Sequence, residues 1–229
     1  MARYFTPDTF AFLRDLAANN ERAWFNDNKA RYEASVRQPA LDFITDYVEP
    51  LETLSPYFVA DSRTVGGSLF RIHRDTRFSK DKTPYKLNTG MHFRHERAKD
   101  AHAPGYYVHL EPKNCFIGAG LWMPEPKVAQ QIRVHIAEHP DEWIAATHSA
   151  PFTSHFELGG ESLKRPPRGI DVDPDDPLMV DLKRKSFIAT GPLKQGDVTK
   201  ADFAEVLTER FRAAAPMMKL LCDAVGVKF

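Results

Sequence analysis

One stretch of this chain concentrates the side chains that can bind negative charge. Between Phe70 and Lys86 lie six Lys or Arg residues and two Asp residues, a local charge of +4 in a chain whose formal charge is zero. Arginine suits an anion site because its planar guanidinium can donate two parallel hydrogen bonds to a carboxylate or a phosphate. We therefore predict an anion-binding pocket built from Arg71, Arg74, Arg77, Lys82, Tyr85 and Lys86, together with Arg168 from a later basic cluster.

The stretch also contains groups that can transfer a proton to or from a bound molecule. The acid–base candidates are His73, Asp75 and Asp81. Arg168 joins the predicted site because Pro167 and Gly169, its direct neighbours, constrain the backbone and so direct its side chain.

The spacing of the basic residues requires an irregular backbone. Basic residues recur at every third position from Arg71 to Lys80. A helix would spread them over half its circumference, and a strand would alternate them between its two faces. Pro84 further disfavours a long helix. We predict a loop held at the end of a sheet, which is a common position for functional residues.

Three hypotheses compete for this stretch. In the first, it binds an anionic small molecule, phosphorylated or carboxylated, in a binding protein or an enzyme. In the second, it binds nucleic acid through phosphate contacts and stacking by Phe78, Tyr85 or Tyr106, although 31 basic against 31 acidic residues disfavour a dedicated nucleic-acid binder. In the third, Asp75 and Asp81 neutralise the arginines in an ion-pair network without a ligand, each exposed pair contributing about 0–1 kcal/mol.

Apolar side chains are interleaved with these charges. We expect Phe70, Ile72, Phe78 and Tyr85 to hold the stretch against the core, where a cation without a partner is costly.

The rest of the chain contains no recognisable metal or cofactor motif. Residues 171–176 begin like a calcium loop, but Asp176 stands at the sixth position, where such loops need glycine. The histidines at His92, His95 and His102 lack the Cys or carboxylate spacing of a zinc site. A phosphate-binding glycine-rich motif is also missing. We therefore expect no metal ion and no cofactor.

The elements that must position the stretch indicate one α+β domain over residues 1–229, with a central, mostly antiparallel sheet packed by N-terminal and C-terminal helices. Apolar periodicity and capping residues predict helices, and short alternating runs predict strands. The expected helices are 7–18, 21–36, one opened by Pro39, 126–139, one beginning at Asp141, a short one after Pro177 that carries residues 183–185, and 200–225 with a kink or an interruption at Pro216; the expected strands are 68–73, 87–95, 106–111, 114–122 and a short one over 152–158.

Two groups on these elements have alternative interpretations. Gly118 and Gly120 lie on one face of the strand 114–122, where they permit close approach of a helix or a ligand, and we expect a helix. Trp24, Asn28 and Tyr32 share a helix face that either lines a pocket or, as is usual at this spacing, packs into the core.

The stretch from Phe70 to Lys86, with Asn88, resembles the signature of the Domain of Unknown Function 2461 family. Further matching segments are Phe12–Leu13, Asn19–Asn20 with Trp24–Phe25, Gly105–Tyr107, Ile132–Arg133 and Lys164–Gly169. The similarity covers nearly the whole chain and implies one α+β domain, but it implies no activity. In the family pattern a His-Pro follows the Arg-Gly segment, whereas Asp176–Pro177 stands here.

Composition narrows the cellular setting. The balanced charge gives no global attraction to DNA or to a membrane. Cys115 and Cys222 are far apart and are expected to be reduced, buried thiols. The first seven residues lack the apolar core of a signal peptide, and no run approaches the roughly 20 apolar residues of a membrane span. We expect a cytoplasmic protein with no membrane partner.

Overall fold

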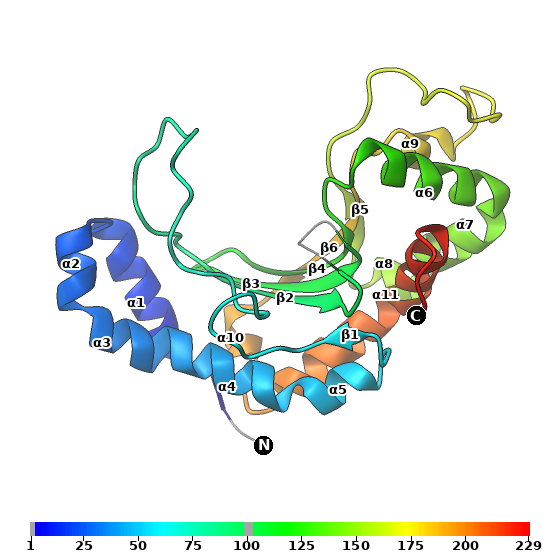
Figure 1. Cartoon of the computed structure of the whole chain (residues 1–229). Coiled ribbons are helices and arrows are strands. Elements are labelled where there is room, and N and C mark those ends of the chain that lie inside the picture. Colours follow the sequence, from blue (N-terminus) through cyan, green and yellow to red (C-terminus); the bar gives the residue numbers. More distant parts are fainter. Residues whose placement is uncertain (1–2, 99–102) are drawn as a thin grey trace.

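A computed structural model describes residues 3–98 and 103–229 of the chain (Figure 1). Within these residues, six strands pair in the order β1-β2-β3-β4-β6-β5, and every neighbouring pair is antiparallel. The strands are β1 (Phe58–Val59), β2 (Thr89–His95), β3 (Gly105–Leu110), β4 (Cys115–Leu121), β5 (Glu157–Gly159) and β6 (Phe187–Leu193). The predicted α+β fold with a mostly antiparallel central sheet is confirmed.

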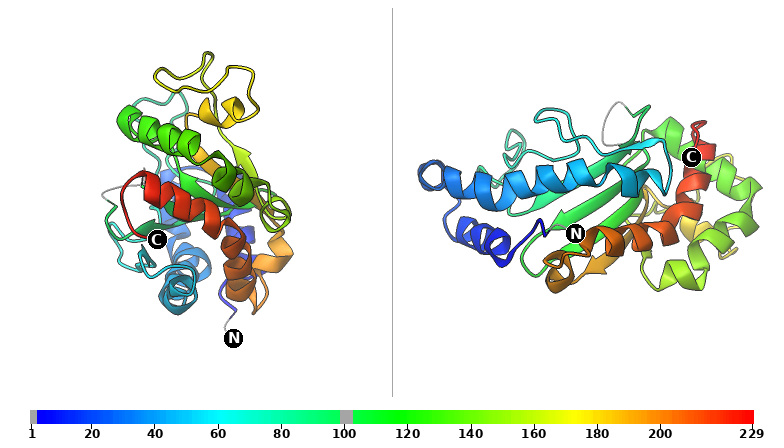
Figure 2. Two further views of the ribbon diagram at one scale, coloured as in Figure 1. Left: turned by 90° about the vertical axis from the view of Figure 1, so that its right-hand side faces the viewer. Right: turned by 90° about the horizontal axis from the view of Figure 1, so that it is seen from below.

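Helices cover one face of this sheet and both of its ends. Seen from below, α4, α5 and α11 run across the sheet (Figure 2), and α4 packs on β2 while α11 packs on β4. The N-terminal helices are α1 (Pro7–Ala18), α2 (Arg22–Asp27), α3 (Lys29–Tyr32), a π-helical turn (Glu33–Arg37), α4 (Gln38–Asp46) and α5 (Val48–Glu52). The C-terminal helices are α6 (Pro126–Glu138), α7 (Pro140–His148), α8 (Ala150–Thr153), α9 (Met179–Leu182), α10 (Gln195–Val198) and α11 (Phe203–Ala224).

Alternation along the strands separates the two faces of the sheet. Tyr106 and Val108 of β3 are fully buried, and the Tyr106 ring centroid lies 4.7 Å from that of Phe211 on α11. Because successive side chains of a strand point to opposite faces, Tyr107 and His109 point away from the helices. Figure 1 shows no helix over that face in the described part of the chain.

The chain rises beside the helix-free face at two places (Figure 1). We call residues 71–86 the basic arm, and α6, α7 and α9 with residues 160–178 the carboxy-terminal arm. The basic arm is irregular, as predicted, but the strand expected over 68–73 does not form. Only the isolated bridges Leu69–Met91 and His73–Tyr85 occur there, because the backbone leaves the sheet too soon for a ladder.

A small aromatic cluster anchors the base of the basic arm. The Tyr85 ring stacks on Phe25 of α2 with centroids 4.1 Å apart, and Ile72 is buried in the same cluster. Tyr32 belongs to this cluster too, so the helix face that carries it packs into the core. Phe78 behaves differently from the expectation: at the tip of the arm it is 95% exposed.

Several helix boundaries differ from those predicted. The helix expected over 21–36 breaks at Asn28 and then continues through a π-helical turn into α4, whose first turn accommodates Pro39. Pro216 lies within α11, which continues without interruption because the buried Met217 and Met218 outweigh one lost backbone hydrogen bond. None of the described helices has the length and apolar character that a membrane span requires.

Two glycines of β4 provide a test of this packing. Gly120 has φ +127°, and a Cβ there would lie 2.0 Å from the Phe187 carbonyl oxygen, whereas a Cβ at Gly118 would meet nothing closer than 3.6 Å. We expect Gly120→Ala to lower the free energy of unfolding by about 3 kcal/mol, from strain and backbone collision. Gly118→Ala should leave it unchanged or raise it by up to about 1 kcal/mol.

Urea unfolding of both variants checks this expectation. Equal losses in the two variants would contradict the packing described for β4.

Candidate functional site

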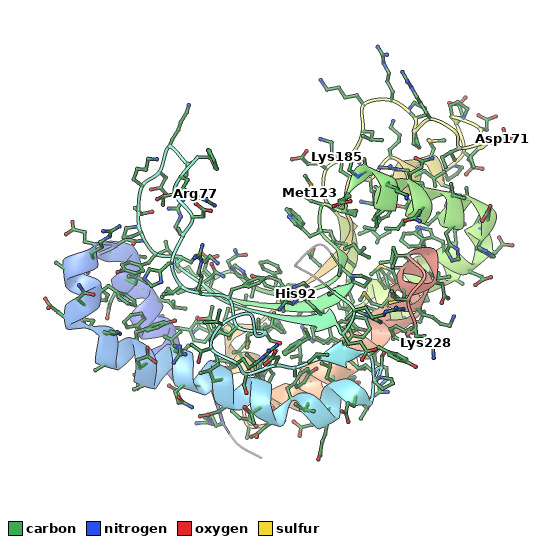
Figure 3. The ribbon with its side chains drawn as sticks, in the orientation of Figure 1. Arg77, His92, Met123, Asp171, Lys185 and Lys228 are labelled. Carbon is green, nitrogen blue, oxygen red and sulfur yellow. The ribbon has the colours of Figure 1, made fainter. Side chains whose placement is uncertain are left out.

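The helix-free face of the sheet contains a cleft of about 510 Å³, a volume within the usual range for small-molecule sites. Figure 3 shows His92 on this face, between the two arms. The cleft is lined by Phe70, His92, Gly105, Tyr107, His109, Phe116, Gly118, Ala119, Gly120, Trp122, Ile188, Ala189 and Thr190. Gly118 and Gly120 therefore face a cavity, and the expectation that a helix packs over them is wrong.

Strand register arranges the cleft floor in rows. One row crosses the sheet as His92, Tyr107, Gly118 and Thr190. The next row pairs His109 with Phe116, whose rings stack with centroids 4.4 Å apart. Polar ring edges therefore lie on the β2–β3 side of the floor, and the middle of the floor is bare backbone.

Two side chains on the cleft face of β3, Tyr107 and His109, form a hydrogen-bonded chain with Glu111, the residue just after the strand. Tyr107 Oη lies 2.9 Å from His109 Nδ1, and His109 Nε2 lies 3.2 Å from a Glu111 carboxylate oxygen. The Asn88 side-chain nitrogen Nδ2, which can only donate, is 3.4 Å from the same Nδ1. Nδ1 is therefore the acceptor, Tyr107 donates to it, and the Nε2 hydrogen is donated to Glu111.

This chain can move a proton. Burial lowers the pKa of His109 against the opposing effect of the Glu111 carboxylate, so the imidazole is neutral near pH 7. Burial and the Glu111 charge raise the pKa of Tyr107 to about 12, which keeps the phenol protonated. A group that hydrogen-bonds to Tyr107 Oη can pass its proton to that oxygen while the phenol proton moves to His109. Such a relay is general-base chemistry.

His92 is a second neutral imidazole in the cleft. The residue is 8% exposed, and its Nδ1 has no hydrogen-bond partner within the described residues. Burial, with a smaller contribution from the Arg94 charge, lowers the pKa of His92 to about 4. A buried polar atom without a partner is uncommon in folded proteins, and a ligand group is one way to satisfy it.

Positive charge borders the cleft beside Phe70. The Lys86 ammonium lies 5.2 Å from the Phe70 ring centroid, and the side chain is only partly exposed. Burial, and then the nearby Arg71 charge, lowers the pKa of Lys86. Across residues 3–98 and 103–229, neither Lys86 nor Arg71 forms an ion pair with a carboxylate.

The other basic residues predicted for the site have partners inside the basic arm. Arg74 donates to Asp81 and to the Thr83 hydroxyl, and Arg77 pairs with Asp75 at 2.6 Å. Hydrogen bonds from these arginines, and from Thr83 in the case of Asp81, lower the pKa of both carboxyls to about 2.

The remaining predicted residues are spread over three places. Lys82 donates to the Thr76 carbonyl at 2.8 Å, and Tyr85 is buried in the cluster that anchors the arm. His73 packs against the Tyr85 ring, while Arg168 belongs to the carboxy-terminal arm, across the cleft. Anion binding by this set of residues stays a prediction.

Sequence reasoning missed the polar groups of the cleft floor, although one signal was present. Tyr107, His109 and Glu111 are two residues apart, the spacing that brings side chains to one face of a strand. His92 was considered only as a metal ligand with His95, which lies on the opposite face of β2. His102 lies outside the described residues, and among the rest no group of three His, Cys, Asp or Glu side chains could hold a metal ion.

Another hollow, of about 690 Å³, lies beside α7 and α8. Its Asp181 and Arg184 side chains pair with each other at 2.7 Å, and Asp181 also accepts from the Trp143 indole. These charges are already neutralised, so this hollow offers less to a charged ligand than the cleft does.

Comparison with known proteins identifies a family without a described activity. A family model described as "Conserved hypothetical protein (DUF2461)" matches residues 8–220. No curated protein and no solved structure matches the chain.

The neutral state of His92 predicts a pH-dependent stability. Below pH 6.5 the unfolded chain binds a proton at His92 that the folded protein does not accept until about pH 4. The free energy of unfolding is therefore unaffected by His92 above pH 6.5. It declines as the pH falls from 6.5 to about 4, because protons then bind the unfolded chain in preference. We expect His92→Phe to remove about 3 kcal/mol of the decline between pH 7 and pH 4.

The measurement is the free energy of urea unfolding across this pH range. His148→Phe, at an exposed histidine, serves as the matched control and should keep the decline of the wild type. A His92→Phe protein that loses stability with acid as steeply as the wild type would refute the assignment.

Proposed function

We propose that this chain, which belongs to the DUF2461 family of conserved hypothetical proteins, binds an anionic small molecule in the cleft on the helix-free face of the sheet. One observation supports the proposal: the Lys86 ammonium lies over Phe70, which lines the cleft, Arg71 is close enough to lower the pKa of Lys86, and neither cation forms an ion pair with a carboxylate among the described residues. A phosphorylated or a carboxylated compound meets this requirement.

A partly buried cation without a carboxylate partner costs free energy. A partly buried ammonium loses hydration, and the charge of Arg71 adds repulsion, which are the two causes that lower the pKa of Lys86. An anion beside both groups would offset the lost hydration and the repulsion together. Arg71 can add the forked hydrogen bonds that a carboxylate or phosphate accepts.

The proposal narrows the set of residues expected from the sequence. Arg74 and Arg77 have their own carboxylates, Asp81 and Asp75, so for these two arginines we favour the ion-pair network. Both pairs are at least partly exposed, and solvent screening keeps the contribution of such pairs to stability small. Arg74 and Arg77 would then make no direct contact with the anion. Their charges would attract it only weakly, because the paired carboxylates and the solvent screen them.

The floor of the cleft would supply polar recognition. His92 offers a neutral imidazole, and Tyr107 offers a hydroxyl coupled to His109 and Glu111. A ligand that hydrogen-bonds to Tyr107 Oη would be positioned for proton transfer, so this arrangement is compatible with an enzyme as well as with a binding protein.

Inorganic phosphate is the probe that tests the anion site. We expect Lys86→Met and Arg71→Met each to weaken phosphate binding by about tenfold, equivalent to about 1.4 kcal/mol for a charge-assisted contact. Arg77→Met is the matched control, because that guanidinium is paired and exposed, and phosphate affinity should change less than twofold.

Calorimetric titration at constant ionic strength measures the affinities, and urea unfolding verifies each fold. Lys86→Met should keep the stability of the wild type, since it removes a cation without a carboxylate partner and retains an apolar chain that can pack on Phe70. The proposal fails if the wild type does not bind phosphate, or if all three variants lose affinity equally.

A further inference from the structure

One glycine in the cleft floor is not required by the packing of the protein itself. A Cβ at Gly105 would lie 2.2 Å from His92 Nε2, and at Gly120 2.0 Å from the Phe187 carbonyl oxygen, so those positions need glycine. A Cβ at Gly118 would meet only ordinary contacts, the nearest being Tyr107 Cβ at 3.6 Å. Glycine inside a strand costs about 0.5–1 kcal/mol relative to alanine. We therefore attribute the absence of a side chain at Gly118 to a ligand that occupies the cleft above it.

Aromatic rings surround the bare position. Tyr107 is its cross-strand neighbour, and Phe116 is two residues before it on the same face of β4. The Tyr107 and Phe116 ring centroids are 5.8 Å apart, and Trp122 lines the same cleft. A flat group can lie against the exposed peptide of Gly118 while its edges meet these rings. Edge-to-face and offset-stacked ring pairs add about 0.5–1.5 kcal/mol beyond area burial.

A second observation points to a ligand in the same row. His92 begins the row that contains Tyr107 and Gly118, and its Nδ1 is buried without a partner in the described protein. Tyr107 separates His92 from Gly118, so a molecule lying on Gly118 with a polar edge toward β2 would reach both side chains. The row thus combines a bare backbone surface at Gly118 with the polar side chains of Tyr107 and His92.

We propose that the ligand is an aromatic or heteroaromatic anion whose flat ring rests on Gly118, beside Tyr107 and Phe116. The inference deepens the proposed function and rests on it for the anionic end of the molecule, which would face Lys86 and Arg71 beside Phe70. A cleft of about 510 Å³ accommodates a compound of one or two rings with a carboxylate or phosphate group.

Three probes separate the ring from the charge: phenyl phosphate has both, inorganic phosphate has only the charge, and phenol has only the ring. We expect wild-type protein to bind phenyl phosphate at least tenfold more tightly than inorganic phosphate. Gly118→Val, which fills the floor, should reduce phenyl phosphate affinity to that of inorganic phosphate and leave inorganic phosphate binding unchanged. Lys86→Met should weaken both phosphates and leave phenol binding unchanged.

Gly196→Val is the matched control, because Gly196 is exposed on α10 with open space around its Cβ position. It should bind all three probes as the wild type does. Valine suits a strand, so we expect Gly118→Val to keep the unfolding free energy of the wild type. If it does not fold, Gly118→Ala replaces it, with an expected loss of about threefold for phenyl phosphate alone.

The outcomes distinguish this inference from the proposed function. If phenyl phosphate binds no more tightly than inorganic phosphate, or if Gly118→Val weakens both equally, the ring site is refuted. If Gly118→Val abolishes phenol and phenyl phosphate binding while Lys86→Met changes neither, the ring site stands and the anionic function fails.

Discussion

The two-residue alternation of β3 and β4 is the constraint on which both faces of the sheet depend. Burial of Tyr106 and Val108 under α11 leaves no freedom in the direction of Tyr107 and His109, which must face the cleft. A slip of one residue would exchange the two sets and place the His109–Glu111 pair against the hydrophobic core. The same contacts that stabilise the fold therefore also position the polar row of the candidate site.

The basic arm is held in place by its base, and only two of its six cations are paired with carboxylates in the described part of the chain. Tyr85 and Ile72 fix its base through the cluster on α1 and α2, and two Arg–Asp pairs lie in its outer part. Lys86 and Arg71, nearer the sheet, form no ion pair with a carboxylate among the described residues, and neither do Lys80 and Lys82 in the outer part.

The sequence supports some features of this architecture much better than others. The β3–β4 hairpin was predictable, since two alternating runs flank Pro112–Lys113, and α1 was predictable from the Thr6 cap and Pro7. The strand β6 was missed because Gly191 and Pro192 interrupt its pattern and its partner β4 lies about 70 residues earlier. The Arg74–Asp81 pair and the cleft over Gly118 depend on loop geometry and strand register, which local propensity does not encode.

The cleft floor is built from segments that lie far apart in the sequence. Phe70, at one edge, precedes the hairpin, whereas Thr190, at the other, arrives with β6 after α6, α7, α8, β5 and α9 have intervened. Detachment of β6 would dismantle the floor while leaving β2, β3 and β4 hydrogen-bonded to one another. A molecule that contacts both β4 and β6 would link early and late segments of the chain. It would slow local opening of β6 and so protect the C-terminal half from proteases.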